Sequence, residues 1–561
     1  PLDFSLAGYL TAIPGFLLIA SAWTKSSILR RIRQGYFGII AFVMSCIFIV
    51  DLGLYGFWGF RLDATPIFYF FSSPKDAMAS VSFWFILLGI LAMLIYAAIL
   101  YGIFYAVLIR EKAPLKIPYQ RQYVSLVLLL LTAALFIPIR GGFSVSTMNL
   151  SKVYYSQNQR MNHAAINPAF SFMYSATHQN NFDKQYRFMD PKVADELLTE
   201  MLDKPVAVTD SIPQILNTQR PNIIFIILES FSTHLMETMG GQPNVAVNMD
   251  KFGKEGVLFT NFYANSFRTD RGLASIISGY PGQPSTSIMK YPEKTDGLPS
   301  IPRSLKNAGY SLEYYYGGDA DFTNMRSYLV SSGIEKIISE TDFPLSERPG
   351  KWGAPDHALF QRFLKDLKEE KQQEPFFKIV QTSSSHEPFE VPFYRLDDKV
   401  LNAFAYADSC VGDFVRQYKE TPMWKNTLIV LVPDHLGAYP RPVENPLEGH
   451  TIPLILIGGA VKEPRVVDTY ASQIDIAATL LSQLGLPHDD FTFSKNIFNP
   501  SSPHFGYFTE PTLFGMVTAE NQLVYNLDAN TVQIDEGTEK GANLEKGKAF
   551  LQKLYDDLAK R

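Results

Sequence analysis

The sequence predicts a multi-pass α-helical membrane domain followed by an α/β domain with a mostly parallel central sheet. Two observations predict this class. Long apolar runs dominate the first 139 residues, and after Pro221 short β-branched runs alternate with helical stretches. An apolar run of about 20 residues is long enough to cross a bilayer. Strands alternating with helices are typical of a parallel sheet covered by helices.

The composition excludes several classes of protein. The chain has 561 residues, of which 47% are hydrophobic and 19% charged, so it is not a disordered polypeptide. Its formal net charge is -5, and without a basic field we expect no nucleic-acid partner. The two cysteines, Cys46 and Cys410, are too few for a disulfide-rich scaffold or a thiolate zinc cluster.

Four apolar runs are candidates for membrane helices. They do not read as a cleaved signal peptide, because they recur and are too long. The fourth is short and the third is long. The runs are Phe4–Trp23, Tyr36–Phe60, Val81–Ile109 and Tyr123–Ile139.

The loop charges predict the orientation of these helices. Basic residues gather after the first run and after the third run, and such loops lie in the cytoplasm. We therefore expect everything after Arg140 to lie outside the cell membrane. The chain begins at Pro1 rather than Met, and we expect a further helix before it, five in all. The loop cations are Lys25, Arg30, Arg31 and Arg33, then Arg110, Lys112, Lys116 and Arg121.

One acidic residue, Asp51, falls inside the second run. It is either an intramembrane proton or lipid-head site, or a residue of the outer interface beside Tyr55, Phe57 and Trp58. We favour the interface.

The predicted organisation has four parts. Residues 1–139 form the membrane helices, and the polar residues 140–220 form a connector on the outer membrane face. Residues 221–510 form the extracytoplasmic α/β domain. Residues 511–561 extend it and include a charged amphipathic helix at Gly541–Arg561, which we expect at the surface.

The α/β domain begins with Ile223–Leu228, an unbroken apolar run that predicts a strand buried on both faces. In such sheets, ligands bind beyond the carboxyl ends of the strands. Similar strands are predicted at Ser311–Tyr316, Phe376–Gln381, Thr427–Val432 and Ile452–Ile457, and helices at Ala358–Lys371 and Leu401–Tyr418.

Candidate chemical groups stand where these strands end or helices begin. Glu229 follows the first strand, Asp434 and His435 follow Thr427–Val432, and His386 follows Phe376–Gln381. Thr269 precedes a helix expected at Leu273–Ser278.

Two carboxylates and an imidazole are a normal ligand set for a divalent metal. A hydroxyl at a helix N-terminus lies where negative charge is favoured, and a metal beside it would make it a nucleophile. Taken singly, Glu229 is also compatible with a helix-capping partner and Thr269 with a simple N-cap.

The ordered set resembles the alkaline phosphatase/sulfatase superfamily, and more narrowly its membrane-bound lipoteichoic acid synthase-like branch. The resemblance covers nearly the whole chain. It rests on the stretches Asn-Ile-Ile-Phe-Ile-Ile-Leu-Glu-Ser, Ser-His-Glu-Pro-Phe, Val-Pro-Asp-His and Ala-Ser-Gln-Ile-Asp-Ile-Ala-Ala-Thr-Leu-Leu at 471–481.

This resemblance implies an α/β sulfatase/alkaline phosphatase-like domain that binds one divalent metal, manganese, with zinc or magnesium as alternatives. Thr269 would also be the nucleophile, and His386 would contact substrate. The implied metal ligands are Glu229, Thr269, Asp434 and His435.

Three further residues are candidates for substrate binding, and two of them have an equally weighted structural alternative. Arg271 could neutralise a phosphate or form a surface ion pair with Asp270. His450 could line the site or be structural, and Asn324 falls in the stretch matched to a head-group motif. We assign structural roles to His234, Trp352, Asp356 and His357.

The activity implied is transfer of a phosphoglycerol-type head group. The donor would be an anionic or zwitterionic phospholipid in the membrane, and the acceptor an extracytoplasmic glycan, lipid or glycerol phosphate. A phosphoethanolamine transferase, a phosphodiesterase or phosphatase of the same superfamily, and a non-catalytic membrane scaffold are the alternatives.

The sequence departs from three family motifs, and the first departure excludes one activity. Sulfatases carry Cys/Ser-x-Pro-x-Arg, whereas this chain has Phe-Arg-Thr-Asp-Arg-Gly, so we do not expect sulfate ester hydrolysis. Lipoteichoic acid synthases have Phe-Trp-Asn-Arg, and the matching stretch here is Phe322-Thr323-Asn324-Met325, with Arg326 one place late. The usual Asp-His-Gly reads Asp434-His435-Leu436.

Overall fold

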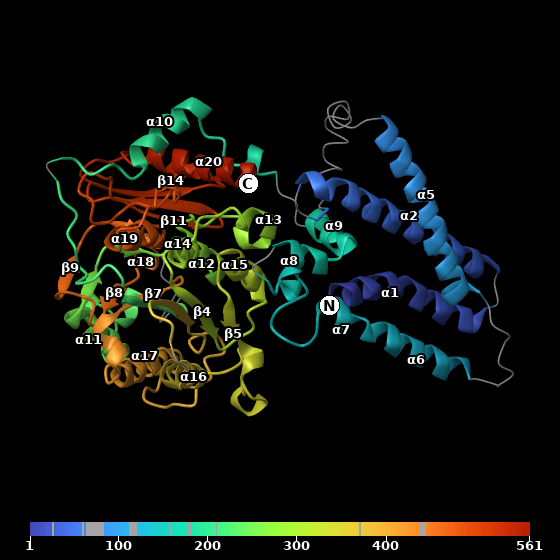
Figure 1. The fold of residues 1–561 in the computed structure, drawn as a ribbon, viewed down its shortest axis with the longest axis horizontal. Helices are drawn as coiled ribbons and strands as arrows, with labels where there is room; N and C mark the ends of the chain where they lie inside the picture. The colour runs from blue at the N-terminus through green and yellow to red at the C-terminus, as the bar shows by residue number, and fades with distance from the viewer. Residues whose placement is uncertain are drawn as a thin grey trace. The chain divides into compact units, whose positions relative to one another are not determined.

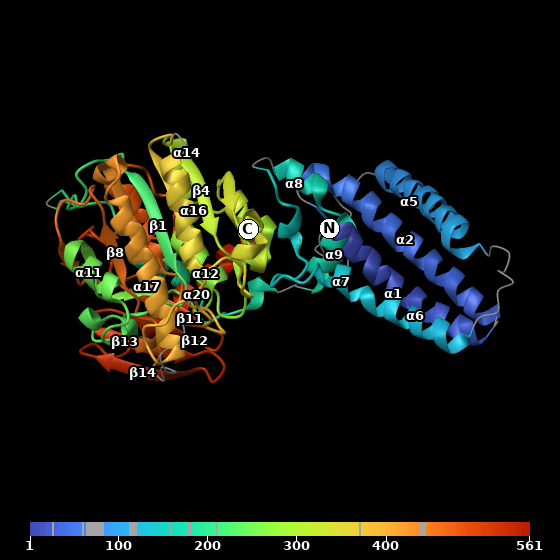
Figure 2. The ribbon, with the colours of Figure 1, turned by 90° about the horizontal axis from the view of Figure 1, so that it is seen from below.

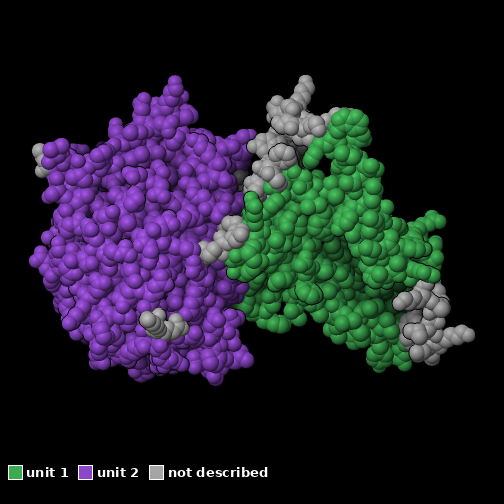
Figure 3. All heavy atoms as spheres, in the orientation of Figure 1, with its two compact units in different colours: residues 1–180 green, residues 181–561 purple. Residues whose placement is uncertain are grey.

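The computed structural model describes the chain except residues 25–26, 59–60, 63–82, 111–119, 157–158, 178–180, 209, 370–371 and 437–444. It divides into two compact units, Pro1–Asn180 and Asn181–Arg561, coloured green and purple in Figure 3. Three of the cations used to predict orientation, Lys25, Lys112 and Lys116, lie outside the described residues.

The first unit consists of long apolar helices. Helix α1 (Leu2–Trp23) packs against α6 (Arg121–Ala134) and α7 (Phe136–Arg140), and α2 (Ser27–Trp58) packs against α5 (Phe83–Phe104), as Figure 2 shows. A short π-helical turn, η1 (Tyr105–Ile109), extends α5. The shorter α8 (Gln159–Ala165) and α9 (Pro168–Thr177) follow.

Four segments of the described chain are long and apolar enough to span a membrane. This confirms the prediction of four candidate membrane helices and indicates a multi-pass membrane protein. Many of their large apolar side chains, such as Leu88 and Leu130, are exposed. The segments are Leu2–Trp23, Ser27–Tyr55, Trp84–Ile109 and Arg121–Arg140.

Asp51 is buried in this unit and forms an ion pair. Its Oδ2 accepts a hydrogen bond from Arg61 Nη1 at 2.6 Å, and its Oδ1 accepts one from the backbone N–H of Leu62 at 2.8 Å. Arg61 Nε donates to the carbonyl of His163 in α8. Arg61 therefore links Asp51 of α2 to His163 of α8.

The second unit is built on an eight-stranded sheet. Every neighbouring pair of strands is parallel except the two pairs that involve β8, which runs antiparallel to both neighbours. The predicted mostly parallel sheet is confirmed. The order is β5 (Lys336–Ile338), β4 (Ser311–Tyr316), β6 (Phe376–Gln381), β1 (Asn222–Leu228), β7 (Thr427–Pro433), β8 (Leu454–Ile457), β2 (Val257–Phe259) and β9 (Arg465–Val467).

One predicted strand begins late. The run at 452–457 forms a strand only from Leu454, because the backbone N–H of Ile452 donates to Phe262 in the separate strand β3 (Phe262–Tyr263). Strand β3 pairs in parallel with β10 (Ala471–Ser472).

Strand β1 lies between two hydrophobic cores, one on each face of the sheet. Successive side chains of a strand point to opposite faces. Ile223, Phe225 and Ile227 belong to one core, with α12 (Thr269–Ser278), α14 (Ile301–Asn307) and α19 (Ile476–Gln483). The alternate residues belong to the other core, with α11 (Val247–Glu255), α16 (Asp356–Glu369) and α17 (Lys399–Tyr418). Figure 1 shows the sheet between these groups of helices.

The C-terminal part forms a second, antiparallel sheet with one helix. Strands β11 (Gly506–Glu510), β12 (Leu513–Val517), β13 (Asn521–Asn526) and β14 (Thr531–Gly537) follow in order. Helix α20 (Leu544–Lys560) buries Phe550, Leu554 and Leu558 in the first core and packs against α10 (Pro191–Met201). The helix expected at the surface therefore has one buried face.

Candidate metal centre

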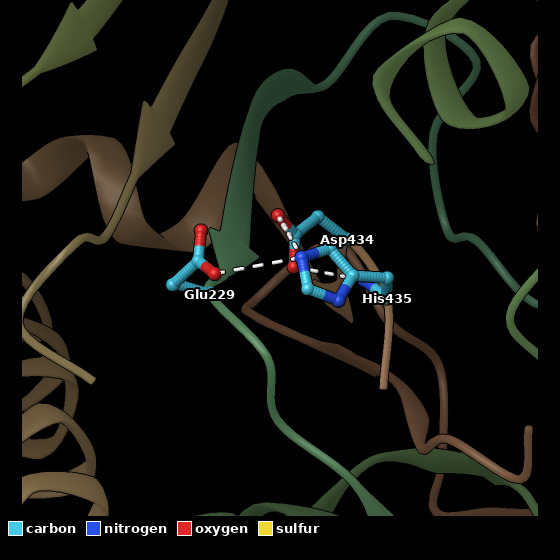
Figure 4. A group of neighbouring side chains, drawn as sticks. All are labelled: Glu229, Asp434 and His435. Carbon is cyan, nitrogen blue, oxygen red and sulfur yellow. Dashed lines mark hydrogen bonds and ion pairs between the residues drawn. The ribbon is translucent and has the colours of Figure 1, made fainter. Parts of the chain in front are cut away.

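Three buried polar side chains gather at the carboxyl ends of two neighbouring strands. The parallel register places Leu228 of β1 opposite Pro433 of β7, so Glu229 and Asp434 leave the sheet side by side. One ligand atom from each of Glu229, Asp434 and His435 lies within 4.8 Å of the others. Figure 4 shows the three groups facing one another at the ends of these strands.

Thr269 completes the group from a third element. It is the first residue of α12, so the helix begins four residues before the expected Leu273. The helix N-cap is Arg268 rather than Thr269. The Thr269 hydroxyl lies 3.4 Å from Glu229 Oε2, to which it donates, and 3.4 Å from His435 Nε2. The structure thus brings together the four side chains predicted as metal ligands.

Hydrogen bonds orient the ligand atoms. The backbone N–H groups of Ser230 and His435 both donate to Asp434 Oδ1, at 2.9 and 2.8 Å. Ser230 Oγ donates to Glu229 Oε1 at 2.7 Å. His435 Nδ1 lies 2.9 Å from the carbonyl of Leu436, which makes Nδ1 the protonated nitrogen and leaves the Nε2 lone pair for a metal.

Asp434 Oδ2 provides the test of whether a metal fits. This atom is buried and has no hydrogen-bond donor among the residues that the structure describes, although it lies 3.6 Å from His435 Nε2. Leaving a buried carboxylate oxygen unpaired is costly. A divalent cation would satisfy it, and two carboxylates with an imidazole and a hydroxyl suit such an ion. The buried Glu229, Asp434 and His435 can therefore hold a metal.

The pKa values of the three groups reflect their mutual charge. Burial alone would raise the pKa of Glu229, but the hydrogen bond and charge of His435, with the charge of His386, outweigh it and lower that pKa. Burial, and then the Glu229 charge, raise the pKa of Asp434. Burial would lower the pKa of His435, but Asp434 and Glu229 raise it. The cluster favours positive charge at its centre.

Several supporting residues escaped the sequence analysis. Gln473 Nε2 donates to the carbonyls of Pro433 and Asp434, both at 2.7 Å. Ser385 Oγ donates to the carbonyl of Glu229, whose own N–H donates to Thr382 Oγ1. Gln473 lies in the 471–481 stretch that carries the family resemblance, and this was its only signal.

His386 lies in the loop that follows β6, close enough for its charge to act on Glu229. Its ring packs on Trp352 with a centroid distance of 3.8 Å. Asn324 is buried in the 3-10 turn η7 (Phe322–Asn324), beside Phe322, whose ring contacts Trp352. These segments meet at the edge of the site.

The other two substrate candidates have protein partners. Arg271 is buried, donates from Nε to the carbonyl of Gln283 at 2.8 Å, and pairs with Asp270 at 3.2 Å. The pair foreseen as an alternative is present, but it is buried rather than at the surface. His450 has Nδ1 at 3.0 Å from the carbonyl of Ala264 and Nε2 at 3.1 Å from Glu510 Oε1.

The comparisons with known proteins agree with this geometry. Residues 221–486, from the start of β1 to just beyond α19, match the Sulfatase family model. The α/β domain, over residues 221–486, belongs to the sulfatase/alkaline phosphatase superfamily. An alkaline phosphatase superfamily protein from Vibrio parahaemolyticus is 26% identical with a TM-score of 0.58, covering 67% of this chain and 98% of that one. The lipoteichoic acid synthase LtaP from Listeria monocytogenes, 19% identical with a TM-score of 0.51, shares the fold over 66% of this chain and 97% of that one.

Curated relatives have a similarly low sequence identity and match about half of this chain. Lipoteichoic acid synthase-like YvgJ of Bacillus subtilis is 23% identical over 311 residues, 50% of each chain. Phosphoglycerol transferase I of Xanthomonas campestris pv. campestris is 24% identical over 320 residues, 52% of this chain and 45% of that protein. The matched region spans about half the length of these relatives.

Proposed function

We propose that this protein is a metal-dependent transferase of the cytoplasmic membrane that moves a phosphoglycerol-type head group. The donor is an anionic or zwitterionic phospholipid, and the acceptor is a glycan, lipid or glycerol phosphate outside the cytoplasm. The observation that carries the proposal is the Thr269 hydroxyl, 3.4 Å from both Glu229 and His435. The names of the relatives support the head group, and the candidate membrane helices support a lipid donor.

The proposed reaction has two steps. Thr269 Oγ1 forms a bond to the head-group phosphorus while the bond from phosphorus to the diacylglycerol oxygen breaks. An acceptor hydroxyl then attacks the same phosphorus and releases Thr269. Glu229, Thr269, Asp434 and His435 would hold a divalent ion, manganese or alternatively zinc or magnesium. Such an ion would supply positive charge that stabilises the alkoxide and the phosphate oxygens.

His386 is the proposed substrate contact. It would hold a phosphate oxygen or give a proton to the departing diacylglycerol oxygen. Arg271, His450 and Asn324 are the other proposed substrate-binding residues. Arg271 and His450 also form hydrogen bonds with protein atoms, and Asn324 lies in the turn η7 next to Phe322.

Trapping of the Thr269 adduct tests the proposal. The purified full chain is incubated with manganese and labelled phosphatidylglycerol or phosphatidylethanolamine, and the Thr269 peptide is analysed by mass spectrometry. We expect a glycerol phosphate adduct on Thr269, loss of turnover in Thr269→Ala, and normal turnover in Thr531→Ala, which changes an exposed threonine of β14. Full activity of Thr269→Ala contradicts the mechanism.

The products separate the alternatives. An adduct formed only from phosphatidylethanolamine identifies a phosphoethanolamine transferase. A head group released only as the free phosphate identifies a hydrolase. A wild-type chain that binds no metal and forms no adduct is a scaffold.

A further inference from the structure

Trp352, at first assigned a structural role, lies against the proposed substrate contact. We propose that Trp352 is a positioning residue that holds the His386 ring at the metal centre. The segment from Trp352 to Asp356, called the clamp below, holds the loop that carries His386. This inference rests on the proposed function, because His386 matters for turnover only if it contacts the substrate.

The indole of Trp352 makes two contacts with the loop that carries His386. Its Nε1–H donates to the carbonyl of Glu387, the residue after His386, at 2.6 Å. Its ring lies against the imidazole, with a centroid distance of 3.8 Å and an interplanar angle of 39°. The Phe322 ring packs against the indole in a T-shaped arrangement, with a distance of 5.7 Å between the ring centroids. One side chain thus fixes both the backbone beside His386 and the plane of its ring.

Asp356 holds the other end of the same loop. Its Oδ1 accepts hydrogen bonds from the backbone N–H groups of Ser383 and Ser384, at 2.9 and 3.2 Å. Its own N–H donates to Ser384 Oγ at 2.9 Å. Asp356 is fully buried, so these bonds form away from competing water. The loop is therefore held on both sides of His386 by residues four positions apart.

The segment from Trp352 to Asp356 packs closely on the backbone that follows β4. The N–H of Ala354 donates to the carbonyl of Gly317, just after β4, at 2.9 Å. A Cβ atom at either Gly317 or Gly353 would lie well under 3.0 Å from backbone of the other segment, and Gly353 has a φ of +79°. Only glycine allows this approach at both positions. The clamp is thereby anchored to the central sheet.

The loop connects this clamp to the metal ligands. Ser385 Oγ donates to the carbonyl of Glu229 at 2.7 Å. A displacement of about 1 Å at a reacting group can lower the reaction rate about a hundredfold. A clamp that keeps His386 in place can therefore affect the rate of transfer.

Chemical labelling tests the clamp without requiring activity. The full chain is treated with diethylpyrocarbonate, and carbethoxylation of His386 is followed by peptide mass spectrometry. We expect His386 to react several-fold faster in Trp352→Ala, where the covering ring is lost. It should react nearly as in the wild type in Trp352→Phe, which keeps a ring, and in the control Trp424→Ala, whose indole packs on Tyr418 instead. An unchanged rate in Trp352→Ala overturns the inference.

Kinetics with labelled phospholipid test whether Trp352 affects turnover through His386. We expect Trp352→Ala to lower kcat at least tenfold while KM changes less than threefold, and Trp352→Phe to restore most of kcat. In a His386→Ala background, Trp352→Ala should cause no further loss beyond twofold, because residues that act as a unit are not additive. An equal loss in both backgrounds overturns the inference. Absence of Thr269-dependent transfer in the wild type refutes the proposed function instead, and the labelling rate still decides the role of Trp352.

Discussion

Gly272 lies against the backbone carbonyl of Asp434, so closely that a Cβ atom at position 272 would lie well under 3.0 Å from that oxygen. Gly272 is in the first turn of α12, the helix that begins with Thr269. The absence of a side chain therefore lets α12, which begins with the proposed nucleophile Thr269, approach the end of β7. This contact joins two proposed ligands that are distant in sequence.

We expect Gly272→Ala to displace the start of α12 and to lower turnover at least tenfold, since a small misplacement of reacting groups is costly. Transfer from labelled phosphatidylglycerol measures the effect. Gly297→Ala is the matched control, because its Cβ would have a single neighbour, at 3.8 Å. Equal activity of the two variants would show that the close approach has no role in placing Thr269.

A bound divalent ion should stabilise the protein through Asp434. A ligand at 100 times its Kd adds about 2.7 kcal/mol to the unfolding free energy, and this should appear as a higher Tm of the detergent-solubilised chain with manganese than with a chelator. We expect Asp434→Asn to abolish the increase and Asp468→Asn, at an exposed site, to keep it. The same melts with zinc and magnesium rank the metals. An increase that survives Asp434→Asn places the ion elsewhere.

A buried ion pair across the sheet should make the second unit sensitive to acid. Lys378 of β6 pairs with Glu313 of β4, and the side-chain exposures are 1% and 15%. Burial would raise the pKa of Glu313, but the charge of Lys378 outweighs it and lowers that pKa. A lowered pKa contributes stability above the ordinary value of 4.5, and this stability is lost as the pH falls through the folded-state pKa.

Glu313→Gln should therefore cost several kcal/mol at pH 7, about 3–5 if Lys378 is left without its partner, and less in acid. Tm measured from pH 7 down to pH 3.5 should converge between the variant and the wild type. Glu335→Gln, which breaks the exposed pair with Lys306, should leave the profile unchanged. A constant difference between Glu313→Gln and the wild type at all pH values would refute the linkage.

The ion pair of Asp51 and Arg61 predicts a structural role for Asp51. Asp51→Asn keeps an oxygen for the N–H of Leu62 but removes the charge opposite Arg61, so we expect a loss of about 1–3 kcal/mol in stability. Turnover per folded molecule should be retained. A variant that is stable but inactive would instead make Asp51 a functional group of the membrane unit.

Local patterns in the sequence predicted five strands of the central sheet, whereas β2, β5, β9 and the C-terminal sheet were not predicted. The run that forms β1 is apolar at every position because its alternate residues enter two different cores. The predicted bounds of β4 and β6 also agree with the structure, and both strands lie inside the sheet. The start of α12 was placed late, because Thr269 to Gly272 carry no helical apolar pattern.

The sequence by itself determined the membrane runs, five strands of the central sheet and the order of the candidate ligands, because length, periodicity and residue type are local properties. Only the tertiary structure decided that Trp352 and Asp356 hold the His386 loop, that Gln473 supports Asp434, and that Arg271 and His450 are engaged by protein atoms. The residues in these contacts are 12 to 60 positions apart in the sequence. They depend on how β1, β6 and β7 align at one edge of the sheet, and no local pattern records that alignment.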